Sequence, residues 1–186
     1  LGGMATVLVT RPTPGEYAIP GAEIHVGPEE GLFERDALVS FIARHAPVDA
    51  IVSMMHDRID DTALDAAGPS LKVVNNFAVG YDNIDVEACE RRGVVVCNVP
   101  DAVTEGTADL AFALLLAAAR RVREADRYAR SEAYPRRGVL GMGDMLGQDI
   151  AGRTLLIVGA GRIGYATALR SIGWGMKVLY VARTRH

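Results

Sequence analysis

The sequence has few of the residues that stabilise small secreted domains or bind structural metals. Its 186 residues include two cysteines, Cys89 and Cys97, which are too few for a disulfide framework. Cys97 ends the apolar run Val94-Val95-Val96, so we expect it to be a small buried core residue. The histidines at positions 25, 45, 56 and 186 lie far apart and have no metal-ligand spacing. A structural zinc site is therefore not expected.

The sequence also lacks an excess of positive charge and a long hydrophobic segment. Its formal net charge of -3 gives no electrostatic attraction to nucleic acid or to an anionic membrane. The most apolar segment, residues 108–119, contains Asp109 and is too short to span a bilayer. The first residues lack the basic and apolar regions of a signal peptide. We therefore expect a cytoplasmic protein that has neither nucleic acid nor a membrane as a partner.

Short β-rich segments alternate with helical patterns in the first half of the chain, which is typical of parallel α/β architecture. The expected strands are residues 5–10, 23–26, 50–55, 71–75 and 94–97, and the expected helices are residues 35–46, 61–67 and 85–92. In the last of these helices, Asp85 can cap the first turn and Gly93 can end the helix. These elements form a unit of about 100 residues, which is an ordinary size for one domain.

The second half of the chain begins with a different kind of element. From Thr104 to about Arg130 the pattern predicts one long helix, apolar in its first half and charged in its second half. Residues 131–152 are rich in glycine and predict an irregular segment, and residues 153–181 then form one strand–turn–helix–strand unit. We place the domain boundary after residue 103, so that residues 104–186 comprise a linking helix and the start of a second domain.

The turn of this last unit carries a glycine motif at the positions a dinucleotide site requires. The motif runs Gly159-Ala160-Gly161-Arg162-Ile163-Gly164, directly after the expected strand 154–158. Gly159 would make the tight turn, Gly161 would let a pyrophosphate approach the backbone, and Gly164 would let the helix lie close to the strand. The helix N-terminus, with Arg162 and Ile163, would offer free N–H groups to the phosphates. A turn that uses its glycines only for packing is the alternative, but the strand–turn–helix context favours dinucleotide binding.

The residues after the second strand, 177–181, bear on the choice of nicotinamide cofactor. An NAD site places a carboxylate there to bind the ribose hydroxyls, whereas this chain has Ala182-Arg183-Thr184-Arg185. Arg183 can bind the 2′-phosphate of NADP in a bidentate manner, and Thr184 can add a hydroxyl donor. We therefore favour NADP over NAD. A solvated loop is the competing interpretation of these residues.

Six stretches of the chain carry a resemblance that is more specific than the glycine motif alone. They are Asn76 to Asp85 (Asn-Phe-Ala-Val-Gly-Tyr-Asp-Asn-Ile-Asp), Asn98 to Thr104, Thr107 to Ala111, Gly147 to Thr154, Gly159 to Gly164 and Tyr180 to Arg185. With these stretches the chain resembles the D-isomer-specific 2-hydroxyacid dehydrogenases, most closely the glyoxylate/hydroxypyruvate reductase branch. The resemblance covers nearly the whole chain from Ala5 onward.

The resemblance implies two doubly wound parallel-sheet domains, a flavodoxin-like substrate domain and a Rossmann cofactor domain, with the active site in the cleft between them. Similar enzymes transfer hydride from the nicotinamide to the keto carbon of a short 2-oxo acid. The N–H groups of Val79 and Gly80 would bind the substrate carboxylate, Met54 and Met55 would border the substrate, and Thr107 would touch the cofactor. Each position has a purely structural alternative: a strand-end turn for the first pair, strand-core packing for the methionines, and a helix first turn for Thr107.

The catalytic Arg, Glu and His of the family have no counterpart in these residues. In the family, the Arg holds the carboxylate, the His protonates the developing alkoxide, and the Glu orients that His. Neither His56 nor His186 has a matching place. Two strands and one crossover helix also cannot cover both faces of a parallel sheet. We therefore expect the second domain to be incomplete, the chain to be a truncated form of a longer enzyme, and the chain by itself to be inactive.

Two other interpretations stay open. The chain could belong to another member of the family, such as a phosphoglycerate, formate or phosphite dehydrogenase. It could also be a cofactor-binding module without catalysis, like the co-repressors that share this fold, and the missing catalytic residues fit that interpretation. The apolar first half of the helix from Thr104 fits the dimer contact of similar enzymes, so we expect a homodimer, although packing within the chain explains that surface equally well.

Overall fold

The computed structural model describes residues 3–15, 17–137 and 140–183. The chain divides into two compact units, Leu1–Pro100 and Asp101–His186. The division falls three residues before the boundary expected from the sequence. In the described ranges, no helix combines the length and apolar character that crossing a membrane requires.

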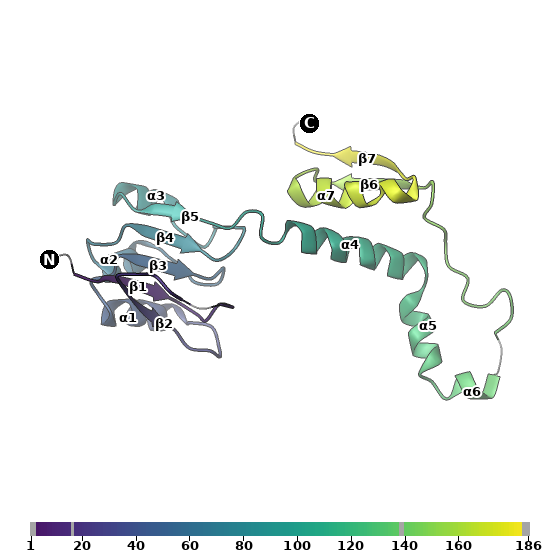
Figure 1. Cartoon of the computed structure of the whole chain (residues 1–186), viewed down its shortest axis with the longest axis horizontal. Helices are drawn as coiled ribbons and strands as arrows, with labels where there is room; N and C mark the ends of the chain where they lie inside the picture. The colour runs from purple at the N-terminus through teal and green to yellow at the C-terminus, as the bar shows by residue number, and fades with distance from the viewer. Residues whose placement is uncertain (1–2, 16, 138–139, 184–186) are drawn as a thin grey trace. The chain divides into compact units, whose positions relative to one another are not determined.

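The first unit is built on a five-stranded parallel sheet with the strand order β2-β1-β3-β4-β5 (Figure 1). The strands are β1 (Ala5–Val9), β2 (Ala22–Val26), β3 (Ala50–Ser53), β4 (Val73–Asn76) and β5 (Val95–Cys97). The helices are α1 (Arg35–Arg44), α2 (Asp61–Ala67) and α3 (Val86–Arg91). This is the strand order of flavodoxin-like folds, so the expected α/β fold of this unit is confirmed.

The core of the first unit lies between one face of the sheet and its three helices. Leu8, Ile51 and Val74 occupy neighbouring register positions on β1, β3 and β4, and none of the three is exposed to solvent. Apolar residues of α1, α2 and α3 pack with them in one cluster. Burial of this continuous apolar surface is the main favourable contribution to the stability of the unit.

Two aspartates fix where α2 and α3 begin. The Asp60 carboxylate accepts hydrogen bonds from the backbone N–H groups of Thr62 and Ala63, and the Asp85 carboxylate accepts one from that of Ala88. Both side chains satisfy donors that have no partner inside a helix. The cap expected at Asp85 is thus confirmed. Gly93, with φ 67°, follows the end of α3 as expected.

Two expectations for the first unit are wrong in detail. The strand expected at residues 50–55 ends at Ser53, because Met54 begins a turn that the Asp57 N–H closes on the Met54 carbonyl at 3.0 Å. Cys97 is exposed instead of buried. It lies on the edge strand β5, where Val96 faces the core, as does Val94 just before the strand, and Cys97 takes the opposite face. Cys89, on α3, is the buried cysteine.

The second unit contains a pair of parallel strands and several helices. Its elements are α4 (Thr104–Ala119), α5 (Val122–Ala129), α6 (Ala133–Arg137), β6 (Thr154–Val158), α7 (Arg162–Arg170), the 3₁₀ turn η1 (Ile172–Trp174) and β7 (Lys177–Val181). The strands 154–158 and 177–181 match the expected bounds. Helix α7 packs against α4, where Arg170 pairs with Glu105 at 2.8 Å and with Asp109 at 2.5 Å.

The long helix expected from Thr104 to Arg130 is two helices, which corrects the sequence-based interpretation. Arg121 adopts a left-handed conformation with φ 54°, and this ends α4 before α5 begins. No glycine or proline marks the break in the sequence. The segment expected to be irregular also contains a short helix, α6.

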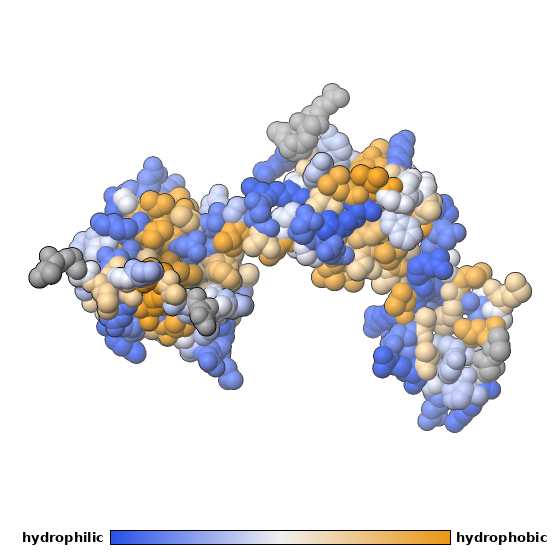
Figure 2. Space-filling model, viewed as in Figure 1, coloured by the Kyte–Doolittle hydropathy of each residue, from blue (hydrophilic) through white to orange (hydrophobic). Residues whose placement is uncertain are grey.

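One face of the β6–β7 sheet carries uncovered apolar side chains, as expected for an incomplete parallel sheet. Leu156 and Leu179 are register partners, as are Val158 and Val181. Their exposed fractions run from 48% for Leu179 to 79% for Val158. Apolar side chains are visible at the surface in this part of the chain (Figure 2). The opposite side of β6 buries Leu155 and Ile157.

Candidate functional site

The carboxyl ends of the strands in the first unit gather the candidate substrate residues at one edge of the sheet. In open parallel sheets, ligands bind outside the carboxyl ends where the strand order reverses. Here that point lies between β1 and β3, because β2 lies on one side of β1 and the later strands lie on the other. Thr10 follows β1 and Met54 follows β3. Met55, Val79 and Gly80 belong to loops that leave this same edge.

The turn that carries Met55 is held by a buried carboxylate. Asp57, which is 5% exposed, accepts hydrogen bonds from the Thr10 hydroxyl at 2.5 Å and from the Met54 N–H at 2.8 Å. These bonds connect the ends of β1 and β3 across the point where the strand order reverses. Met55 lies in this turn with 60% of its surface exposed, so it is available to border a ligand.

The loop after β4 is held in place by hydrogen bonds that its carbonyl groups accept. The carbonyl of Ala78 accepts a hydrogen bond from the Val99 N–H at 3.1 Å, that of Val79 accepts one from Asn98 Nδ2 at 2.8 Å, and that of Gly80 accepts one from Asn76 Nδ2 at 2.7 Å. Three consecutive carbonyl groups are therefore occupied by donors from the protein. This arrangement fixes the backbone of the loop without using the N–H groups of Val79 and Gly80.

The N–H groups of Val79 and Gly80 are available to a ligand. In the described part of the chain, neither donates a hydrogen bond. A peptide unit is planar and trans, so a carbonyl group and the following N–H group point in opposite directions. The bonds to the Ala78 and Val79 carbonyls therefore orient the N–H groups of Val79 and Gly80 respectively. Two adjacent free donors of this kind can bind a carboxylate.

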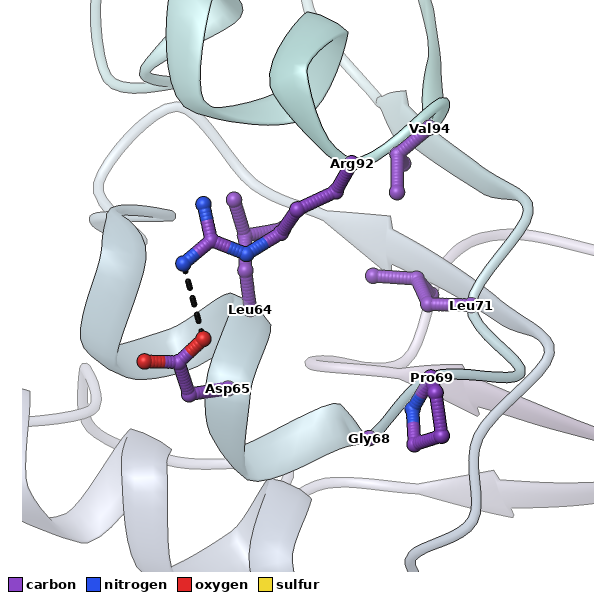
Figure 3. Close-up of a pocket in the computed structure, with 7 residues that line it drawn as sticks. All are labelled: Leu64, Asp65, Gly68, Pro69, Leu71, Arg92 and Val94. Carbon is purple, nitrogen blue, oxygen red and sulfur yellow. Dashed lines mark hydrogen bonds and ion pairs between the residues drawn. The ribbon is translucent and has the colours of Figure 1, made fainter.

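The first unit also has a cavity of about 390 Å³, whose lining side chains are drawn in Figure 3. Its lining residues are Leu64, Asp65, Gly68, Pro69, Leu71, Arg92 and Val94. Leu71 and Val94 precede β4 and β5, so the cavity belongs to the opposite edge of the sheet. The Arg92 guanidinium is paired with Asp61 at 2.5 Å and with Asp65 at 2.7 Å. These pairs raise the pKa of Arg92 and occupy its donors, so we do not assign an anion site to this cavity.

In the second unit, each glycine of the motif has the geometry that a dinucleotide loop requires. Gly159 has φ 98°, and its N–H donates to the Val181 carbonyl at 2.8 Å. A Cβ atom on Gly161 would meet no protein atom within 4 Å, which leaves space for a phosphate. A Cβ atom on Gly164 would lie 2.1 Å from the Gly159 carbonyl oxygen and 3.0 Å from Ile157, so only glycine permits this close packing.

The first turn of α7 presents donors to the same space. Gly161 is the N-cap residue and provides no side-chain cap. The N–H groups of Arg162, Ile163 and Gly164 therefore have no partner within the helix. The Arg162 side chain is 3.1 Å from Asp101, so the contribution available from Arg162 is its backbone N–H group. These features fit the pyrophosphate of a nicotinamide dinucleotide.

The remaining candidate cofactor residues lie near this loop or on α4. Ala182 and Arg183 follow β7, whose last residue, Val181, is the register partner of Val158 at the start of the loop. Arg183 is exposed, and no described side chain pairs with its guanidinium. Thr107 is exposed in the first turn of α4. Thr184 lies outside the described residues.

Sequence reasoning missed the side chains that hold the candidate site. Thr10, Asp57, Asn76, Asn83 and Asn98 were given no role, although Asn76, Asn83 and Asn98 lie inside the stretches that carry the resemblance. Among the described residues, no group of His, Cys, Asp and Glu side chains is placed to hold a metal ion. A polar residue directly after a buried strand was the available signal, because such a residue lies at the ligand-binding edge of a parallel sheet.

The comparison with known protein families settles which family these features belong to. The D-isomer specific 2-hydroxyacid dehydrogenase catalytic domain matches residues 22–171, which is more than half of the chain. The chain belongs to this family.

Relatives of this chain include several archaeal proteins. A glyoxylate reductase from Thermococcus kodakarensis is 47% identical over 183 residues, which cover 96% of this chain and 54% of the relative. A glyoxylate reductase from Korarchaeum cryptofilum is 49% identical over 177 residues, covering 94% and 52%. The crystal structure of the TT0316 protein from Thermus thermophilus matches with a TM-score of 0.85 at 38% identity, covering 97% of this chain and 57% of that one. The chain spans about half the length of the curated relatives it matches.

Proposed function

We propose that the protein to which this chain belongs is an NAD(P)-dependent oxidoreductase that interconverts a small 2-oxo acid and its 2-hydroxy acid. Glyoxylate and hydroxypyruvate are the proposed substrates, because the similar archaeal proteins are glyoxylate reductases. We assign residues 1–103 to the substrate domain and residues 104–186 to the linking helix and the first half of the cofactor domain. The proposal rests above all on the glycine loop, whose three glycines each have the geometry that their role in binding a dinucleotide requires.

The chemistry divides between the two sets of candidate residues. The N–H groups of Val79 and Gly80 would hold the substrate carboxylate, and Met55 would border the rest of the molecule. The loop from Gly159 to Gly164 would hold the pyrophosphate. When bound, the reduced nicotinamide supplies the hydride that the keto carbon accepts. We propose that residues 1–186 by themselves are inactive, because the family's catalytic Arg, Glu and His have no counterpart among them.

The dinucleotide site is tested by Gly161→Asp in the product of the complete open reading frame. The added carboxylate would fill the open space beside the α7 N-terminus and repel the pyrophosphate, so we expect NADPH binding to weaken at least about a hundredfold. The measurement is a fluorescence titration with NADPH. Gly173→Asp is the matched control, because Gly173 also faces open space but lies outside the loop. Equal NADPH affinity of wild type and Gly161→Asp would contradict the proposal.

The proposed preference for NADP rests on Ala182, Arg183 and Thr184. Arg183→Glu would remove a guanidinium that can bind the 2′-phosphate and would introduce a carboxylate that repels it. We expect the ratio of NADPH to NADH affinity to fall by at least about tenfold, since one charge-assisted hydrogen bond contributes about 1.5–3 kcal/mol. Parallel titrations with the two cofactors measure this ratio. An unchanged ratio would indicate that Arg183 lies in a solvated loop and would leave NAD as the alternative cofactor.

Two other functions make different predictions in an activity assay. A phosphoglycerate, formate or phosphite dehydrogenase would turn over its own substrate and not glyoxylate. A non-catalytic module would bind the dinucleotide without turnover of any of these acids. Oxidation of NADPH by glyoxylate or hydroxypyruvate, followed at 340 nm with the complete protein, distinguishes the proposed enzyme from both alternatives. If it is absent, reduction of NAD or NADP by phosphoglycerate, formate or phosphite distinguishes another dehydrogenase from a non-catalytic module.

The proposal also covers assembly and location. Leu110 and Leu114 on α4 are 59% and 60% exposed, and we propose that they contribute to a homodimer contact, as the apolar first half of this helix predicts. Sedimentation of the complete protein tests this. A Leu110→Arg variant that remained dimeric would contradict the contact.

The proposed location is the cytoplasm, where a soluble nicotinamide dinucleotide is available.

A further inference from the structure

A pair of asparagines connects the two loops that carry the candidate substrate residues. Asn83 Nδ2 donates hydrogen bonds to the carbonyl groups of Met54 at 3.1 Å and Asp57 at 2.9 Å, at the two ends of the turn that carries Met55. Asn76 Nδ2 donates to Asn83 Oδ1 at 2.9 Å and to the Gly80 carbonyl at 2.7 Å. One side-chain network therefore holds both loops.

The network is buried at Asn76 and Ser53 and partly buried at Asn83, and its donors are satisfied. Asn76 and Ser53 are both completely buried, and the Ser53 hydroxyl donates to Asn76 Oδ1 at 2.9 Å. Both Nδ2 hydrogens of each asparagine have an acceptor. Buried polar networks with every member satisfied are rigid, because breaking one bond leaves an unpaired polar group in a low-dielectric environment. The two loops therefore cannot shift independently without such a cost.

We infer that Asn83, acting with Asn76, is a positioning residue that sets the place of Met55 relative to the N–H groups of Val79 and Gly80. The inference rests on the proposed function, in which those N–H groups bind the substrate carboxylate and Met55 borders the rest of the molecule. Neither asparagine needs to touch the substrate. Their role is to keep the carboxylate donors and the bordering side chain at the separation that a two-carbon or three-carbon 2-oxo acid requires.

The test uses two Asn83 variants of the product of the complete open reading frame. Asn83→Asp keeps the size of the side chain but replaces the Nδ2 donor by an oxygen that faces two carbonyl groups. Asn83→Ala removes the connection entirely. Asn75→Ala is the matched control. Asn75 lies next to Asn76 on β4, and its side chain belongs to no hydrogen bond of this network. The probe is oxamate, a non-reducible analogue of a 2-oxo acid, titrated in the presence of NADPH.

For both Asn83 variants we expect the Kd of oxamate and the KM of glyoxylate to rise about tenfold or more, because small misplacements of binding groups have large effects on productive binding. The Kd of NADPH should stay within about twofold of wild type. Asn75→Ala should leave all three values unchanged. This pattern separates positioning from a general loss of structure, which would weaken NADPH binding as well.

The possible failures are distinguishable. If wild type bound NADPH but neither oxamate nor glyoxylate, the proposed function would be overturned, and the inference with it. If wild type bound oxamate and both variants bound it equally well, only the inference would be overturned. A parallel loss of NADPH binding in both variants would show that Asn83 is a purely structural residue, and this result would also overturn the inference.

Discussion

At the scale of single residues, the most demanding feature is a buried carboxylate without a cationic partner. Asp57 is 5% exposed, and no described cation pairs with it. Its charge is stabilised by the Thr10 hydroxyl and the Met54 N–H. Hydrogen bonds to charged groups contribute more to stability than hydrogen bonds between neutral groups. The loss of one partner leaves the charge poorly solvated. Thr10 is therefore important for stability although it is a single small side chain.

Thr10→Val should lower the free energy of unfolding by about 1.5–3 kcal/mol, because valine keeps the shape of threonine but cannot donate to Asp57. Urea denaturation of the complete protein, followed by circular dichroism, measures the change. Thr6→Val is the matched control, since Thr6 lies on β1, which Thr10 directly follows, and its hydroxyl makes no hydrogen bond that contributes to this turn. Equal stability of the two variants would show that the Asp57 carboxylate does not depend on Thr10.

Residues with a local signature were predictable from the sequence, and residues that act through distant partners were not. Gly159, Gly161 and Gly164 could be assigned separate roles, because each role follows from the spacing of the motif along one strand–turn–helix unit. Asn83 had no such signature. Its partners Met54 and Asp57 lie 29 and 26 residues away, and they come within reach only when β3 and β4 pair.

At the scale of secondary-structure elements, the start of α2 illustrates how one side chain can combine a cap with ion pairs. Burial alone would raise the pKa of Asp60, but hydrogen bonds from Arg35, the Ala63 N–H and Arg58 outweigh it and hold the pKa below its ordinary value of 3.8. A carboxylate whose pKa is lowered on folding contributes stability above its unfolded pKa. That contribution is lost as the pH falls through the folded value.

Asp60→Asn keeps the cap of α2 but removes the charge, so it should reduce the free energy of unfolding at pH 7 by about 0.5–1 kcal/mol. The difference between variant and wild type should shrink below about pH 4 and vanish once Asp60 is protonated in both states. Denaturation at pH 7 and pH 3 gives the two values. Asp36→Asn, in the first turn of α1, is the control. If the difference in unfolding free energy between Asp60→Asn and wild type stayed constant with pH, the Asp60 charge would not be the cause of the stabilisation.

Elements with a clear period and clear ends were predictable, whereas breaks set by a single backbone angle were not. Helix α2 begins and ends at the expected residues, because Asp60 caps it and Gly68 follows it. The break between α4 and α5 depends on a left-handed conformation at Arg121, a residue type that rarely adopts one. Strand β3 ends early because the Met54 N–H donates to the Asp57 carboxylate, three residues further along the chain from Met54, and so begins a turn.

At the scale of the whole molecule, the two units differ in how completely their sheets are covered. The first unit has a continuous core beneath five strands. In the second unit, every residue of β7 is exposed to solvent, and β6 is the one described strand that pairs with β7. The alternation of strands and helices predicted the α/β fold of both units, and the presence of only two expected strands and one crossover helix in residues 153–181 predicted the uncovered face. No local pattern could define the cores residue by residue, because burial depends on which strands become neighbours.

This difference predicts unequal protection from hydrogen exchange when residues 1–186 are studied on their own. Local opening requires less free energy where few apolar contacts are lost. We expect backbone N–H groups of β7 to exchange at least about a hundredfold faster than those of β3 and β4, which lie in the interior of the first sheet. Hydrogen–deuterium exchange followed by mass spectrometry of peptic peptides measures the ratio.

Strand β5 is the internal control for this prediction, because it is also an edge strand but Val96, and Val94 just before the strand, pack against the core of its unit. If edge position alone determined exchange, β5 and β7 would exchange at similar rates. If coverage of the sheet determines it, β5 should be protected and β7 should not. Strong protection of β7 in residues 1–186 would contradict this account, because it would require that its exposed apolar side chains are covered by contacts that the described residues do not provide.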